Sequence, residues 1–223
     1  LDTPDKVLAQ AGAALRVRNT EQGWVQTLKS GAGGSGGFSQ RMELEMPVAG
    51  PRPELHRFPP EVLSLLLPCA RFVDLAAVYE TRFERTFWNV RLPDGSRVEV
   101  ALDRGAILAG RRSEALHEVE LELKSGHAGS LRQLAEQLAQ GVLLVPFDLS
   151  KAQRGNALAT GQARKPQRAD HPVLRADMPC CHAAARIVQS CLAQLQHNLI
   201  GWLDDTTVGD GSQDRIEYLH QAR

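Results

Sequence analysis

The sequence predicts an α+β protein, with an antiparallel β-barrel covered by helices on its outside and a helical segment after it. Three observations support this fold class. Several short runs alternate charged and aliphatic residues with a period of two, which is typical of strands with one polar and one apolar face. Turn residues such as Pro93-Asp94-Gly95 separate neighbouring runs. In the later part of the chain, apolar residues recur at helical spacing instead.

The strands are expected in the first half of the chain, after a turn and connector over residues 1–12. Their predicted ranges are 13–19, 23–30, 38–47, 78–91, 96–103, 106–110 and 115–124. The glycine-rich run from Gly31 to Gly37 reads as a flexible hairpin loop, because it lacks the ending of a phosphate-binding Walker loop. A proline-rich excursion leads from Pro51 into a short apolar helix near residues 61–67.

Helices are expected after the last strand. Residues 128–140 read as an amphipathic helix that covers the outside of the barrel, with Leu131, Leu134 and Leu138 on its apolar face. A polar, proline-containing linker follows, and then a long helix over 177–204. Another helix begins near Asp214.

The clearest chemical signal is the run Glu118-Val119-Glu120-Leu121-Glu122-Leu123, which aims three carboxylates in one direction and three aliphatic side chains in the other. Stacked carboxylates repel one another, so water, cations or a metal ion must face them. A plain solvated face explains any single strand of this kind. Several strands nevertheless carry almost only Arg, Lys and acidic residues on one face, which favours a barrel with a charged lumen.

The resemblance to a known family rests on an ordered set of segments. These are Asp2-Thr3-Pro4-Asp5, Ala14 to Arg18, Thr27-Leu28-Lys29, Gln40-Arg41-Met42-Glu43, Phe83-Glu84-Arg85 to Trp88, Glu99 to Asp103, Glu118 to Glu122, and Ser150 to Gly155. In this order and spacing the chain resembles a CYTH domain, of the triphosphate tunnel metalloenzyme family. It is most similar to the bacterial inorganic triphosphatases that carry a CHAD domain behind the CYTH domain.

The resemblance implies an eight-stranded barrel and a division of the chain into a CYTH domain over 1–160, a linker over 161–176 and the start of a helical CHAD domain over 177–223. The family's first strand, with a Glu-x-Glu-x-Lys pattern at the extreme N-terminus, is absent from the start of this sequence, which opens at Leu1 directly in the Asp2-Thr3-Pro4 segment. The chain is therefore expected to be truncated at both ends, to lack its first strand, and to be less active than a longer parent protein.

The resemblance also assigns roles to the charged residues. The phosphate-binding cations would be Arg16, Arg18, Lys29, Arg41, Arg85, Arg97, Lys151 and Arg154, because guanidinium forks bind phosphate oxygens well. The ligands of Mg²⁺ or Mn²⁺ would be Glu118, Glu120 and Glu122. The carboxylates that orient the attacking water, or hold a second metal, would be Glu43, Glu45, Glu99 and Asp103.

The implied function is metal-dependent hydrolysis of inorganic triphosphate to pyrophosphate and phosphate. Two alternatives stay open. One is an adenylyl cyclase or a thiamine or nucleoside triphosphatase on the same fold, although the sequence offers no clear aromatic platform for an organic group. The other is a non-catalytic module that binds polyphosphate.

Composition limits the other classes of function. Across 223 residues, 26 basic side chains balance 26 acidic ones, which argues against a general binder of nucleic acid or membrane surfaces. No segment has the apolar length of a membrane span. The spacing of the four cysteines does not suggest a disulfide framework, which fits a reducing cytoplasm. Unpaired strand edges would allow a homodimer.

Overall fold

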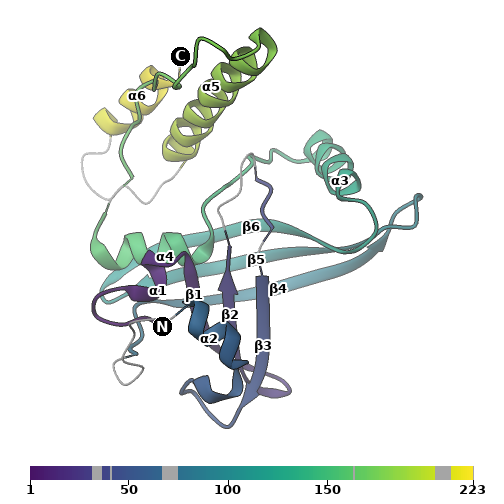
Figure 1. Ribbon diagram of the computed structural model, residues 1–223, viewed down its shortest axis with the longest axis vertical. Helices are drawn as coiled ribbons and strands as arrows, with labels where there is room; N and C mark the ends of the chain where they lie inside the picture. The colour runs from purple at the N-terminus through teal and green to yellow at the C-terminus, as the bar shows by residue number, and fades with distance from the viewer. Residues whose placement is uncertain (32–36, 41, 67–74, 163, 204–211, 223) are drawn as a thin grey trace. The chain divides into compact units, whose positions relative to one another are not determined.

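The computed structural model describes residues 1–31, 37–40, 42–66, 75–162, 164–203 and 212–222 (Figure 1). The predicted phosphate-binding residue Arg41 lies outside these ranges. The chain divides into two compact units. The first consists of residues 1–81, 107–113 and 148–161, and the second of residues 82–106, 114–147 and 162–223.

The first unit is built on a three-stranded antiparallel sheet. In sheet order its strands are β1 (Ala13–Thr20), β2 (Gly23–Ser30) and β3 (Met42–Val48). Leu15, Leu28 and Leu44 lie opposite one another across the three strands, so they share one face. The alternation of side chains then puts the charged residues of these strands on the opposite face, as the sequence predicts.

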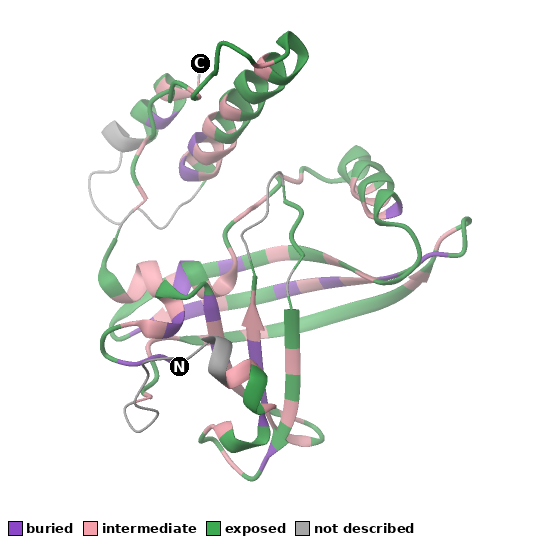
Figure 2. Cartoon of the chain, viewed as in Figure 1, coloured by how far each residue is buried: buried purple, intermediate pink, exposed green. Residues whose placement is uncertain are grey.

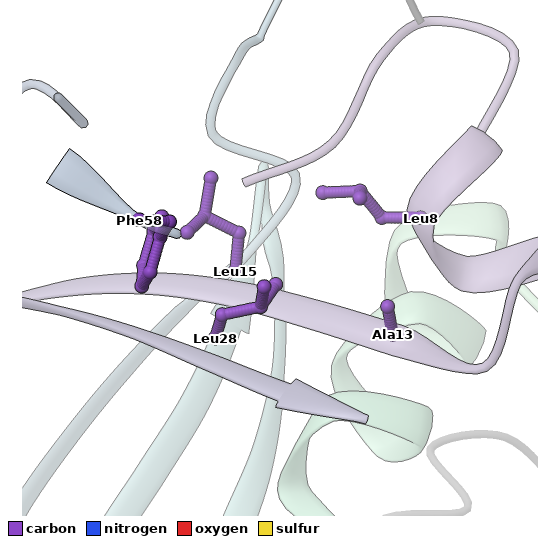
Figure 3. Close-up of a cluster of buried hydrophobic side chains, with 5 residues drawn as sticks. All are labelled: Leu8, Ala13, Leu15, Leu28 and Phe58. Carbon is purple, nitrogen blue, oxygen red and sulfur yellow. The ribbon is translucent and has the colours of Figure 1, made fainter. Parts of the chain in front are cut away.

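The apolar face of this sheet forms the core of the first unit (Figure 3). The buried cluster consists of Leu8, Ala13, Leu15, Leu28 and Phe58. Leu8 comes from the short helix α1 (Val7–Gln10) and Phe58 follows the 3-10 helix Leu55–Arg57. The buried carboxylate of Asp2 accepts hydrogen bonds from the Leu8 and Ala9 backbone amides and so fixes the start of α1.

Two further helices belong to the first unit, α2 (Pro60–Leu66) and α4 (Lys151–Thr160). The sequence analysis did not predict α4. Its first turn is closed by a capping box in which the Ser150 side chain accepts from the Gln153 amide and the Gln153 side chain accepts from the Ser150 amide. The helix ends at Gly161, which adopts the left-handed conformation with a φ of 69°.

The second sheet is formed by three long strands that follow one another in the chain. In order they are β4 (Glu80–Arg91), β5 (Arg97–Ala109) and β6 (Arg112–Ser125). The connections between them are too short for anything but antiparallel neighbours. Buried residues recur along the central strand β5, whereas β4 is mostly exposed (Figure 2). The two predicted strands 96–103 and 106–110 are one continuous strand.

The described strands thus pair into two separate three-stranded sheets, and no closed barrel is seen among them. The α+β class and the antiparallel pairing are confirmed. Closure into an eight-stranded barrel stays a prediction from the family resemblance.

The second unit also contains three helices, α3 (Ala128–Gly141), α5 (Cys180–Leu203) and α6 (Ser212–Gln221). Helices α5 and α6 pack together where the buried Tyr218 ring lies against Gly201, at which a side chain would leave no room for the ring. Among the described helices, none is long and apolar enough to cross a membrane.

The segment before α5, predicted as a linker, runs along that helix and is hydrogen-bonded to it. The side chain of the fully buried Asn198 accepts from the Gln167 amide and donates to the Gln167 carbonyl, both at 2.9 Å. Farther along, Arg186 donates to the Val173 carbonyl at 3.0 Å. In the second unit, therefore, this segment is held against α5 by side chains of that helix.

Candidate functional site

The polar face of the first sheet gathers three predicted phosphate-binding cations and two predicted catalytic carboxylates. The strand register puts Arg16 opposite Thr27 and Lys29 opposite Glu43. The Nζ atom of Lys29 lies 2.8 Å from Oε2 of Glu43. Arg18 donates to Oε1 of Glu45 at 2.6 Å. Period-two alternation alone therefore predicted that these side chains share a face.

Arg16 lies between the two carboxylates, with its Nη2 atom 3.8 Å from an oxygen of Glu43 and 3.8 Å from an oxygen of Glu45. The hydroxyl group of Thr27, a fully buried residue, also donates a hydrogen bond to Oε1 of Glu45 at 3.0 Å. Sequence reasoning missed Thr27, although its parity with Lys29 was a usable signal.

These ion pairs remain accessible to solvent. The side chains of Arg16, Arg18 and Lys29 are 34%, 42% and 35% exposed. Pairs of this kind contribute little to stability, so the cations can exchange a carboxylate for another anion at small cost. Three cations against two carboxylates leave this face with a net positive charge, which suits an anionic ligand.

Helix α4 carries the predicted residues Lys151 and Arg154, which share a face because they are three positions apart. Arg154 is only 7% exposed. The carboxyl end of the helix is bonded to Arg112, whose Nη1 atom donates to the carbonyls of Leu158 and Ala159 at 3.2 Å each. A cation at this end is favoured by the helix dipole. No sequence pattern pointed to Arg112.

In the second unit, Arg85 on β4 joins two acidic residues from the neighbouring strands. Its Nε and Nη2 atoms donate to the two oxygens of Asp103 on β5, at 2.7 Å each. Nη2 also donates to Oε2 of Glu120 on β6. Hydrogen bonding to Asp103 raises the pKa of the Arg85 guanidinium, and the charge of Glu120 acts in the same direction. Arg85 therefore stays charged at every accessible pH.

Asp103, Glu118 and Glu120 form the carboxylate cluster, in which one oxygen from each residue lies within 4.8 Å of the others. Asp103 is fully buried, Glu118 is half-buried and Glu120 is exposed. Hard oxygen ligands at this spacing fit a divalent cation such as Mg²⁺ or Mn²⁺, with waters in its remaining positions. The sequence predicted two of these three residues as metal ligands and the third as a catalytic carboxylate.

The remaining predicted residues of the second unit lie near one end of β5 and β6. Lys124 contacts both Glu99, at 3.2 Å, and Glu122, at 2.9 Å. Desolvation is the largest single influence on the pKa of Lys124 and lowers it, but the hydrogen bonds and charges of Glu122 and Glu99 together outweigh it, so the pKa is raised. Arg97 begins β5 and is exposed. Glu122, predicted as a metal ligand, is thus paired with a lysine that the sequence analysis did not consider.

Comparison with protein families matches residues 1–155 to the CYTH domain. A curated relative, the inorganic triphosphatase of Haemophilus influenzae, is 33% identical to the chain over 165 residues. The aligned region covers 72% of this chain and 45% of the relative, so the chain spans less than half of the relative's length.

Proposed function

The chain belongs to the CYTH domain family, and from this premise we propose that it performs metal-dependent hydrolysis of inorganic triphosphate to pyrophosphate and phosphate. CYTH enzymes act on phosphoanhydride bonds and use divalent metals. The observation that carries the proposal is the carboxylate cluster of Asp103, Glu118 and Glu120, because a metal-dependent triphosphatase needs carboxylates that can hold a divalent cation.

Substrate binding would be the task of the cations. Triphosphate carries about four negative charges near neutral pH, so it needs several positive groups that keep their charge in a partly enclosed site. Arg16, Arg18 and Lys29 offer this on the first sheet, where they form ion pairs with Glu43 and Glu45. Lys151 and Arg154 on α4, in the same unit as that sheet, would add to the phosphate contacts. Arg41, Arg85 and Arg97 stay phosphate-binding residues predicted from the family resemblance.

The metal would be held by Asp103, Glu118 and Glu120, whereas Glu122, predicted from the sequence as a ligand, pairs with Lys124. A bound Mg²⁺ or Mn²⁺ supplies charge neutralisation at the phosphate oxygens. Arg85 orients this cluster, because its guanidinium holds the carboxylates of Asp103 and Glu120 at fixed distances. It also offsets part of their mutual repulsion.

The terminal phosphoryl group is transferred to water, and the protein's contribution is positioning and electrostatic stabilisation. Glu43 and Glu45 are the carboxylates we propose for orienting that water, and the same role for Glu99 stays a prediction from the family resemblance. Glu45 suits this role because Thr27 fixes one of its oxygens. An orienting carboxylate has to be held rigidly to be effective.

The test is a phosphate-release assay on the protein. Inorganic tripolyphosphate, ATP and thiamine triphosphate are compared with Mg²⁺, with Mn²⁺ and with a chelator. We expect the highest kcat/KM with inorganic tripolyphosphate and no release with the chelator. Faster release from ATP or thiamine triphosphate would overturn the substrate assignment. Tight binding of tripolyphosphate without turnover would identify a binding module instead.

A further inference from the structure

Helix α4 approaches the ring of Tyr79 unusually closely, and it does so at a glycine. A methyl group built on Gly155 would lie 2.4 Å from both Cγ and Cδ2 of Tyr79 and 2.7 Å from Cδ1. Such distances do not occur between real atoms, so the ring lies directly on the helix backbone. Gly155 is buried, and the residue before it is Arg154, also buried.

Both ends of the same helix are fastened. The Ser150 and Gln153 capping box closes the first turn, and Arg112 binds the last carbonyls. The Arg112 guanidinium also covers Gly161, where a methyl group would lie 2.8 Å from its Nη2 atom. All these residues lie in the first unit. The capping box stabilises the first turn of α4 internally, whereas Tyr79 and Arg112 contact the helix from outside, at its middle and at its carboxyl end.

We propose that Tyr79 is a positioning residue, whose ring seats α4 through Gly155 and thereby sets the place of Arg154 among the phosphate-binding cations. The inference rests on the proposed function, because it presumes that Arg154 contacts the substrate. Gly155 is adjacent to Arg154 in the helix, so any displacement of the backbone at Gly155 moves the start of the Arg154 side chain by a similar amount.

The ring, and not the hydroxyl group, carries this role. Tyr79 is mostly enclosed, and burial raises the pKa of its hydroxyl group, while the charge of Arg16 acts in the opposite direction. The phenol therefore stays neutral near pH 7 and supplies no charge to the site. What it supplies is a flat surface against the backbone of α4, which phenylalanine would supply equally well.

The experiment measures the dissociation constant of inorganic tripolyphosphate by calorimetry on the full-length protein, with a chelator present so that nothing is turned over. The variants are Arg154→Ala, Gly155→Ala, the two combined, Tyr79→Phe and Tyr79→Leu. Gly129→Ala is the matched control, because Gly129 is also helical but has open space around its Cα. Thermal melting of each variant monitors the fold.

Arg154→Ala is expected to weaken binding roughly 10- to 100-fold, as the loss of a charge-assisted contact does. Gly155→Ala should approach that loss, and the double variant should bind no more weakly than Arg154→Ala alone. Tyr79→Leu, which opens space instead of filling it, should weaken binding too. Tyr79→Phe and Gly129→Ala should match the wild type.

Wild-type affinity in Gly155→Ala and Tyr79→Leu would overturn the inference. Independent, multiplying losses for Arg154→Ala and Gly155→Ala would also overturn it, because a general structural effect would persist after Arg154 is removed. If Gly155→Ala does not fold, Tyr79→Leu is combined with Arg154→Ala instead. This double variant should bind tripolyphosphate no more weakly than Arg154→Ala alone, and a further loss of affinity would overturn the inference. Failure of the wild type to bind tripolyphosphate would instead refute the proposed function.

Discussion

Arg85 and Asp103 face each other across β4 and β5 in a bidentate ion pair, with Nε 2.7 Å from Oδ1 and Nη2 2.7 Å from Oδ2. Asp103 is fully buried, whereas Arg85 is 34% exposed. A carboxylate inside a protein needs such a partner to remain charged. The pair therefore links the stability of this sheet to the carboxylate cluster.

Replacing Arg85 by methionine should lower the free energy of unfolding at pH 7 by about 2 to 3 kcal/mol, because it leaves the charge of Asp103 buried without its bidentate partner. The variant's Asp103 would have its folded-state pKa raised above the unfolded value. The loss of unfolding free energy in Arg85→Met, relative to the wild type, should therefore be largest above that raised pKa and should shrink as the pH falls through it. Urea unfolding between pH 4 and 8 measures this. The control is Arg85→Met combined with Asp103→Leu, which should recover much of the loss, and an undiminished deficit there would contradict the account.

Glu120→Gln and Glu122→Gln form a matched pair on the same face of β6. Only Glu120 belongs to the carboxylate cluster, whereas Glu122 pairs with Lys124. Losing one ligand charge should weaken Mn²⁺ binding about tenfold or more in Glu120→Gln, while Glu122→Gln stays close to the wild type. Titration followed by the electron paramagnetic resonance of free Mn²⁺ distinguishes the two. A larger effect for Glu122→Gln would restore the ligand set predicted from the sequence.

We expect Asp94, in the turn between β4 and β5, to contribute to the stability of this hairpin in a pH-dependent way. The Ser130 hydroxyl, and then the backbone and hydroxyl of Ser96, donate to its carboxylate and lower its pKa to about 2. A depressed carboxyl pKa stabilises the fold above the unfolded-state value near 4 and ceases to do so as the pH falls through about 2. Asp94→Asn should therefore have a lower melting temperature than the wild type at pH 7, and this difference in melting temperature should narrow between pH 4 and 2. A gap independent of pH would show that the charge is not involved.

Asn198→Ala should release the segment that runs along α5. It removes the acceptor and the donor that pair with the backbone of Gln167. We expect faster hydrogen exchange at the Gln167 amide and faster cleavage by trypsin after Arg168. His182→Ala, at an exposed position of the same helix, is the control and should change neither. Unchanged exchange in Asn198→Ala would mean that the segment is held by other contacts.

Local patterns in the sequence predicted the strands and their faces well. The alternation of Arg16 and Arg18 with leucine and valine is enough to assign the polar face of β1, because side chains of a strand alternate strictly. The boundaries of β1, β2 and α3 agree with prediction to within a residue. The predicted break between residues 103 and 106 lies inside β5, where Gly105 has no side chain and so admits the backbone of Arg82 and Phe83.

Features that depend on distant contacts were beyond local patterns. The place of Asp103 beside Glu118 and Glu120 depends on the pairing of β5 with β6, which composition does not encode. Helix α4, in contrast, could have been predicted from a local pattern. Ser150 and Gln153 form a capping-box pattern in the sequence, but the sequence analysis did not use it. The charged faces of several strands favoured a barrel, and its count of eight strands came from the family resemblance. Closure of a barrel requires pairing between strands far apart in the chain, which local patterns do not encode.

The most direct test of the central claim is phosphorus NMR of inorganic tripolyphosphate incubated with Mg²⁺ and the full-length protein. The account predicts that the tripolyphosphate signals disappear while pyrophosphate and orthophosphate appear in equal amounts. It also predicts that a chelator, or Glu120→Gln, stops the conversion. Tripolyphosphate that remains intact with folded, metal-loaded protein would contradict the proposal that this protein hydrolyses inorganic triphosphate.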